Sequence, residues 1–300
     1  MTAAEALLRR QEVGGDIKSV VRVMKSLSAV SIKQYDTAVK TLEEYHFSVR
    51  LGLQAVLQQA ALTPRVEPFP GAAEAYIVFG SDRGLCGRFN ETAVKRVAVR
   101  LSDAEKNGRK TFVLVIGARA AAYLEASNTL CSNVLPVPGA VKAVSETVES
   151  ILMWIDEKHE QDKIGNVVVF NNSRTLESLA VAQEQQLLPV TEQWLSQLKE
   201  ESWPSRGLPA FSVAADKLFS ILIREHLFIS LFRATAESIA SEHASRLSAM
   251  QRAERHIDEY LEALGAEIRE DRQNSITQEL LDIVASYNVL LERDDSEAEI

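Results

Sequence analysis

Cysteine and histidine are scarce in this sequence, and their placement argues against several kinds of site. Only two of the 300 residues are cysteines, Cys86 and Cys131, too few and too far apart for a disulfide framework or a cysteine-based metal cluster. The five histidines are scattered and never form an H-x-x-H or H-E-x-x-H motif, so a zinc site has little support. We therefore expect a reducing compartment, and we expect neither a metal site nor a cofactor.

Long apolar runs and excess basic charge are also missing. No stretch approaches the roughly 18 uninterrupted apolar residues of a membrane span, and the segment from Met1 to Arg10 lacks the apolar core of a signal peptide. Lys and Arg number 33 against 42 Asp and Glu, which gives a net charge of −9 and a pI near 5.3. Nucleic acid is not expected as the main partner, because phosphate binding needs a basic surface. We expect a prokaryotic cytoplasmic protein with no transmembrane segment, which reaches any membrane only through partners.

Two long helical patterns occupy the ends of the sequence. In each of them, apolar or small residues recur at steps of three and four, which places them on one seam of a helix. The N-terminal seam consists of Val20, Met24, Leu27, Ser31, Tyr35, Ala38, Leu42, Tyr45, Val49, Leu53 and Val56. The C-terminal seam consists of Leu247, Met250, Glu254, Ile257, Leu261, Leu264, Ile268, Ile276, Leu280, Ile283, Tyr287 and Leu290. Because a long amphipathic helix needs a partner, we expect the two ends to pair, antiparallel, into a coiled-coil shaft that projects and is held by another molecule.

Proline-rich linkers separate this shaft from a central segment. Pro64, Pro68 and Pro70 follow the first long pattern, and the linker at residues 203–209 precedes the second. We predict an N-terminal shaft helix over 1–63, a globular α/β domain over 71–203, a C-terminal shaft helix over 208–293 and an acidic tail, frayed or disordered, over 294–300. Gly14 and Gly15 are expected to break any short leading helix, with Asp16 as the N-cap of the long one.

Strand and helix patterns alternate in the central segment. Predicted strands cover residues 75–79, 112–116, 134–135 and 167–170, and predicted helices cover 90–106, 118–125 and 141–159. This alternation is typical of βαβ units and a mainly parallel sheet. The expected fold class is therefore α+β overall: a long antiparallel coiled coil of the N- and C-terminal helices with an inserted, Rossmann-like α/β domain.

The turn from Gly80 to Gly87 is the best candidate for chemistry, because glycines between a strand and a helix can bind phosphate. However, the G-x-G-x-x-G spacing is absent and no Gly-Lys-Ser/Thr follows, so a tight structural turn is the favoured interpretation. Cys86 lies in the same turn, and a buried thiol is favoured over a nucleophile since no paired base is close in sequence. No catalytic residue is predicted. The alternative functions are a small-molecule-binding α/β enzyme with a coiled-coil dimerisation arm and a coiled-coil scaffold.

Three separated stretches are similar to the γ subunit of F-type ATP synthases. The first and strongest stretch is C-terminal and has two blocks: residues 241–250 match the family's S-E-x-x-x-R-x-x-A-M, and residues 272–280 match its R-Q-x-x-I-T-x-E-L. Residues 81–87 together with Asn90 match S-D-R-G-L-C-G-x-x-N after a strand, and residues 17–20 with Met24-Lys25 form a weaker third match. Since the matches lie in both shaft helices and in the central segment, the resemblance spans most of the chain.

This resemblance implies a non-catalytic central rotor stalk. The stalk would pass through a ring of three α and three β subunits and couple translocation of an ion, H⁺ or Na⁺, to ATP synthesis or hydrolysis. The ε subunit and the membrane c-ring are further implied partners, and the implied location is peripheral, at the cytoplasmic face of a bacterial membrane. The residues implied to contact α or β subunits are Met24, Lys25, Arg246, Gln273, Thr277 and Glu279.

The sequence departs from the family pattern at both ends of the shaft. The family's first helix usually carries several basic residues just after this methionine, whereas residues 29–33 offer only Lys33. The acidic tail extends past the usual apolar tip, and it must emerge into water because charge is costly in an apolar sleeve. These departures favour a divergent γ subunit, such as that of an alternative, cation-pumping F-type ATPase.

Overall fold

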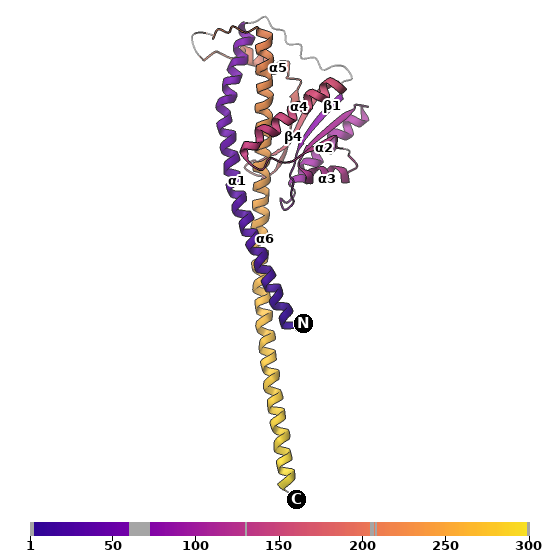
Figure 1. The fold of residues 1–300 in the computed structure, drawn as a ribbon, viewed down its shortest axis with the longest axis vertical. Coiled ribbons are helices and arrows are strands. Elements are labelled where there is room, and N and C mark those ends of the chain that lie inside the picture. The colour runs from indigo at the N-terminus through magenta and orange to yellow at the C-terminus, as the bar shows by residue number, and fades with distance from the viewer. Residues whose placement is uncertain (1–2, 60–72, 130, 205–206, 208, 299–300) are drawn as a thin grey trace. The chain divides into compact units, whose positions relative to one another are not determined.

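Figure 1 shows the computed structural model of the chain, which describes residues 3–59, 73–129, 131–204, 207 and 209–298. Its elements are α1 (Ala3–Gln59), β1 (Ala73–Phe79), α2 (Phe89–Lys106), β2 (Thr111–Ile116), α3 (Ala118–Ala126), β3 (Asn133–Leu135), the 3-10 helix η1 (Val141–Ala143), α4 (Val144–Asp162), β4 (Ile164–Ser173), β5 (Val181–Leu188), α5 (Glu192–Glu200) and α6 (Ala215–Ala298). The chain divides into two compact units, unit 1 with residues 1–26 and 250–300 and unit 2 with residues 27–249. The linker prolines Pro64, Pro68 and Pro70 lie outside the described residues.

The five-stranded sheet in unit 2 has the order β3-β2-β1-β4-β5. Its first four strands are parallel, as expected from the βαβ alternation, and β5 runs antiparallel to β4. Strand β5 was not predicted, because Val181–Leu188 is an edge strand rich in Gln and Glu, without the buried apolar run of β1. The expected α+β fold with a central α/β region is therefore confirmed, with one strand, β5, and one helix, α5, in addition to the predicted elements.

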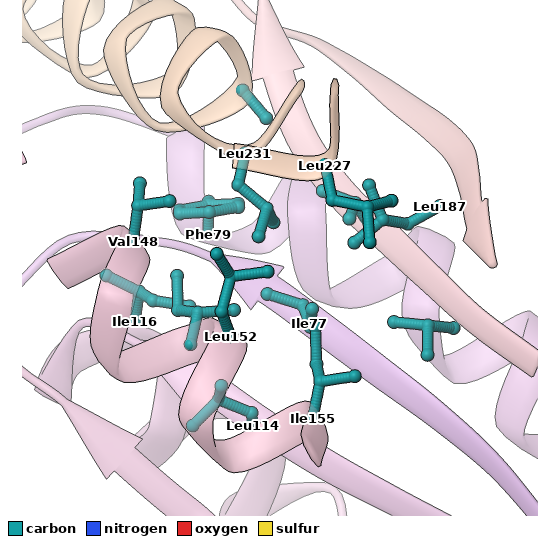
Figure 2. Close-up of a cluster of buried hydrophobic side chains, with 14 of the residues drawn as sticks. Ile77, Phe79, Leu114, Ile116, Val148, Leu152, Ile155, Leu187, Leu227 and Leu231 are labelled. Atoms are coloured by element: carbon teal, nitrogen blue, oxygen red, sulfur yellow. The ribbon is translucent and has the colours of Figure 1, made fainter. Parts of the chain in front are cut away.

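Helices cover both faces of this sheet. On one face, Val94 and Val97 of α2 and Leu124 of α3 pack against side chains of β1, β2 and β4. On the other face, α4 and α6 pack against the sheet in a second core cluster. Figure 2 shows Leu227 and Leu231 of α6 close to the side chains of the sheet and of α4. The α6 segment in unit 2 is thus part of the core of the α/β unit.

Helix α1 presents a buried seam with a seven-residue repeat. The positions of this repeat, each buried or half-buried, are Leu7, Gly14, Val21, Ser28, Tyr35, Leu42, Val49 and Val56. Most of the predicted seam is confirmed, but Val20, Leu27 and Tyr45 are wrong, since they are 59%, 62% and 45% exposed. Val21 and Ser28 are buried in place of Val20 and Leu27. The reason is that Val20 and Val21 are both apolar and Leu27 is larger than Ser28, so hydrophobicity alone favours the wrong neighbour.

Gly14 and Gly15 do not break α1, contrary to the prediction, because the helix runs without interruption from Ala3 to Gln59. Within unit 1 a Cβ on Gly14 would lie 2.7 Å from Leu261 Cδ2, whereas a Cβ on Gly15 would meet nothing within 4 Å. Gly14 therefore permits close approach of α1 and α6, and the contacts with α6 offset the low helix propensity of the glycine pair.

The C-terminal seam is confirmed as far as Ile268 and corrected from Ile276 to Ile283, while the side chains of Tyr287 and Leu290 lie outside the described part. In unit 1, Met250 and Leu264 are buried, but Ile276, Leu280 and Ile283 are 50%, 58% and 64% exposed. By that point the antiparallel pairing has reached the start of α1. Helix α6 also continues to Ala298, through most of the segment expected to fray, and residues 299–300 lie outside the described part. The search of the described helices for an apolar stretch long enough to cross a membrane found none.

Candidate functional site

The loop after β1, whose sequence matches one family motif, is held by its own side chains. The Ser81 backbone N–H donates to Asn90 Oδ1 at 3.0 Å, and Asn90 Nδ2 donates back to Ser81 Oγ at 2.8 Å. Ser81 Oγ in turn donates to the carbonyl oxygen of Arg83 at 2.8 Å. Ser81 and Asn90 are buried, so this network satisfies polar groups that would otherwise be costly inside the protein.

The structure brings the second family motif to this loop. Arg246 Nη2 donates to the carbonyl oxygens of Gly84 at 3.3 Å and Arg83 at 3.5 Å, and it pairs with Glu242 Oε1 at 2.7 Å. The side chains of Arg246 and Glu242 are only 9% and 8% exposed. We call Arg246, Glu242 and the Arg83–Gly84 carbonyls the Arg246 cluster. It joins α6 to the loop across more than 150 positions of sequence, as the separations of 163 and 162 residues show.

Charge in the Arg246 cluster is only partly compensated. Burial raises the pKa of Glu242 above its usual range, Arg246 opposes that rise, and the nearby charge of Asp82 adds to it. The Asp82 carboxylate accepts hydrogen bonds from the backbone N–H groups of Ala118 and Val137, each at 3.0 Å. Asp82 therefore ties the loop to the start of α3 and to the segment after β3. The motif residues Ser81, Asp82, Asn90 and Arg246 are thus structural partners within unit 2.

Close packing, rather than phosphate binding, accounts for glycine at positions 80 and 117. A Cβ on Gly80 would lie 2.1 Å from Ala120 Cβ, and one on Gly117, which has φ +118°, would lie 2.7 Å from the backbone N of Ser81. Close packing of the loop after β1 against α3 and the segment before it therefore requires glycine at positions 80 and 117, whereas a Cβ on Gly84 would meet nothing within 4 Å. Burial raises the pKa of the Cys86 thiol, which disfavours the thiolate that a nucleophile needs. Among the described residues, no group of three or more His, Cys, Asp or Glu side chains is arranged to hold a metal ion.

The predicted residues Gln273, Thr277 and Glu279 lie near the end of α6. Every residue from 272 to 286 is exposed, including the large apolar side chains of Ile276, Leu280, Leu281, Ile283 and Val284. Gln273 and Thr277 are four residues apart and share one face of the helix, and Thr277 Oγ1 donates to the Gln273 carbonyl at 2.8 Å. This stretch therefore presents both polar and apolar side chains to solvent.

Met24 and Lys25 are half-buried in unit 1. Lys25 Nζ pairs with Glu254 of α6, and Arg22 Nε pairs with the same carboxylate at 3.1 Å. The sequence placed Glu254, a charged residue, at a seam position, but no role was predicted for it. Lys25 and Arg246 thus have partners inside the chain, and contact of all six predicted residues with other subunits stays a prediction.

Comparison with known proteins identifies the family to which the chain is similar. The model of the ATP synthase family (ATP-synt) matches residues 4–290. The chain is 27% identical over 296 residues to an ATP synthase gamma chain of Mycobacterium tuberculosis, covering 93% of this chain and 94% of the relative. A gamma chain of Mycobacterium leprae is 27% identical over 295 residues, with 92% and 94% covered. A chain in a cryo-EM structure of the OSCP/F1/c-ring part of the Euglena gracilis mitochondrial ATP synthase shares the fold, with a TM-score of 0.66, 15% identity, and 96% of this chain and 94% of that chain covered.

The chain belongs to the ATP synthase gamma family. Its function is therefore that of the central rotor stalk of an F-type ATP synthase, a component of that membrane-associated complex, and the small-molecule enzyme is not favoured. The two family motifs of α6 lie in different surroundings. The Arg246 cluster joins the shaft helix α6 to the α/β fold within unit 2, and residues 272–286 of α6 are exposed.

Proposed function

We propose that this gamma-family chain is a non-catalytic stalk that turns inside a ring of α and β subunits, and that residues 272–286 contact that ring. The observation that carries the proposal is the exposure of this whole stretch together with its five large apolar side chains. Contiguous exposed apolar surface of this kind marks an interaction site. The polar residues matched to the family, Gln273, Thr277 and Glu279, lie in the same stretch.

The proposed mechanism follows from the asymmetry of a helix inside a ring. As the stalk turns, each β subunit meets a different face of α6, so the contacts favour one conformation of that subunit over another. A ligand or partner shifts such an equilibrium only by its differential affinity for the two states. In this proposal the α and β subunits perform the nucleotide chemistry, and the α/β unit of the chain lies against ε and the c-ring at the cytoplasmic face of the bacterial membrane.

The test is a pair of substitutions on one face of α6. We expect Gln273→Ala with Thr277→Ala, in the complex assembled with the host's own α and β subunits, to lower ATP-driven ion pumping per ATP hydrolysed. A hydrogen bond to a partner is worth about 0.5–1.5 kcal/mol, so each lost bond should weaken the coupled step roughly two- to tenfold. Ion uptake into vesicles and phosphate release, measured on one preparation, give the ratio.

Ser220→Ala is the matched control. Like Thr277, Ser220 is exposed and its hydroxyl donates to the carbonyl four residues earlier, that of Asp216 at 2.9 Å. Loss of such a bond alone should leave pumping unchanged. Unaltered pumping in the double variant, or failure of the tagged chain to recover α and β subunits with ATPase activity, would contradict the proposal.

A further inference from the structure

One charged residue occupies the apolar seam of α6 in unit 1. The seam from Leu247 to Ile268 otherwise contains only Met, Leu and Ile, and Glu254 lies between Met250 and Ile257. The Glu254 side chain is 17% exposed and accepts from two cations of α1, Arg22 and Lys25. These two partners hold the pKa of Glu254 below its usual range, Lys25 having the larger effect, so the carboxylate is charged at neutral pH.

A second ion pair follows the same alignment of the helices. Lys18 pairs with Asp258. Lys18 lies four residues before Arg22 on α1, and Asp258 lies four residues after Glu254 on α6. This is the order required by antiparallel helices in a single register. Asp258 is half exposed at 50%, whereas Glu254 is largely covered, so Glu254 is the more demanding of the two acceptors.

The apolar seam does not define the register by itself. Its side chains recur every three or four residues, so a slide of one turn places apolar residues against apolar residues again. A slide of one turn toward the Lys18–Glu262 alignment would move Glu254 past Arg22 and Lys25 and bring Asp258 beside Arg22, whereas the opposite slide would bring Glu254 beside Lys18. Only the observed register gives the largely covered Glu254 carboxylate two cations. A polar residue at one seam position is a known way for a coiled coil to specify register.

We propose that Glu254, bound by Arg22 and Lys25, is a positioning residue that fixes the register of α1 against α6 in unit 1 and prevents sliding when the shaft is under torque. The register is a property of the chain alone. Its consequence for coupling rests on the proposed rotor function, so the two are tested separately.

The register is tested by disulfide cross-linking of the full-length chain, with the half-buried Cys131 changed to Ser. Lys18→Cys with Asp258→Cys reports the observed register, and Lys18→Cys with Glu262→Cys reports a slide of one turn. We expect Glu254→Gln to increase the slid product several-fold relative to the native product. The control is Glu259→Gln, because Glu259 pairs with His256 of its own helix at 3.4 Å. An equal product ratio in the two variants would overturn the proposal.

Coupling is tested by reversing charges in the assembled complex. We expect Glu254→Lys, and separately Arg22→Glu with Lys25→Glu, to lower ions pumped per ATP. Combining the three changes restores the opposite-charge contacts and should restore pumping. If Lys25 acts on another subunit instead, the triple variant will stay as defective as the Arg22→Glu, Lys25→Glu pair, which would overturn the proposal. A wild-type chain that assembles no coupled ATPase refutes the rotor function, whereas the cross-linking ratio judges the register in either case.

Discussion

Replacing Arg246 with Met should destabilise unit 2 strongly, because it leaves the Glu242 carboxylate buried without its partner. The ion pair spans 2.7 Å and both side chains are less than one-tenth exposed. Removing one partner of a buried pair costs about 3–5 kcal/mol, and the two longer bonds to the Arg83 and Gly84 carbonyls are lost with it. We take the lower end, about 3 kcal/mol, since Glu242 can bind a proton in response.

Urea denaturation followed by tryptophan fluorescence measures this loss. All three tryptophans, Trp154, Trp194 and Trp203, lie in unit 2, so the signal reports the unit that contains Arg246. With a urea dependence of about 2–3 kcal/mol/M, the midpoint should fall by about 1 M. Arg88→Met is the control: Arg88 also lies in unit 2, its side chain is 79% exposed and it pairs with Glu91 three residues later, so its effect should stay within about 0.5 kcal/mol.

The stability lost in Arg246→Met should depend on pH, because Glu242 titrates. The pKa of Glu242 is already above its usual range because of burial, and losing Arg246 raises it further. A carboxyl group whose pKa is higher in the folded chain contributes stability below its unfolded pKa and loses it as pH rises through the folded pKa. The Arg246→Met defect should therefore be smaller at about pH 5 than at about pH 8.

A double variant isolates the ion pair. Glu242→Gln with Arg246→Met removes both charges, and it should recover much of the stability lost in Arg246→Met alone. A coupling energy near zero, or a defect of Arg246→Met that is the same at both pH values, would refute the reasoning that the buried pair joins loop and helix.

Two further predictions concern unit 1 and acid stability. Gly15→Ala should slow amide hydrogen exchange in α1 by raising helix stability about 0.5–1 kcal/mol, whereas Gly14→Ala should gain nothing, since its Cβ would lie 2.7 Å from Leu261 Cδ2; equal gains would contradict close helix packing. The ring of His226 stacks on Trp194 at 4.5 Å, and its pKa is lowered to about 4, chiefly by burial. Stability from this neutral ring is present above the unfolded pKa near 6.5 and is lost as pH falls toward 4. His226→Phe should therefore lower the pH at the midpoint of acid unfolding, measured by circular dichroism. An unchanged midpoint would contradict a role of His226 protonation in acid unfolding.

Much of the fold could be predicted because its signals are local. The strands β1, β2 and β4 each contain a continuous apolar run, and a parallel sheet covered on both faces requires such runs. Strand β5 gave no such signal, because Gln and Glu on an edge strand look like a surface segment until β4 is placed beside it. Motif spacing likewise identified residues 81–87 of the loop and residues 241–250 and 272–280 of α6 from the sequence alone.

The sequence by itself determined that two long amphipathic helices flank an α/β segment, since periodicity is carried by each helix alone. It did not determine which face of α1 is buried before Tyr35, because Val20 and Val21 are both apolar and the choice between them depends on α6. Only the tertiary structure decided that Arg246 binds the Arg83 and Gly84 carbonyls and that Glu254 binds Arg22 and Lys25. These contacts join residues more than 150 positions apart, and a partner at that distance is chosen by packing, which no local pattern encodes.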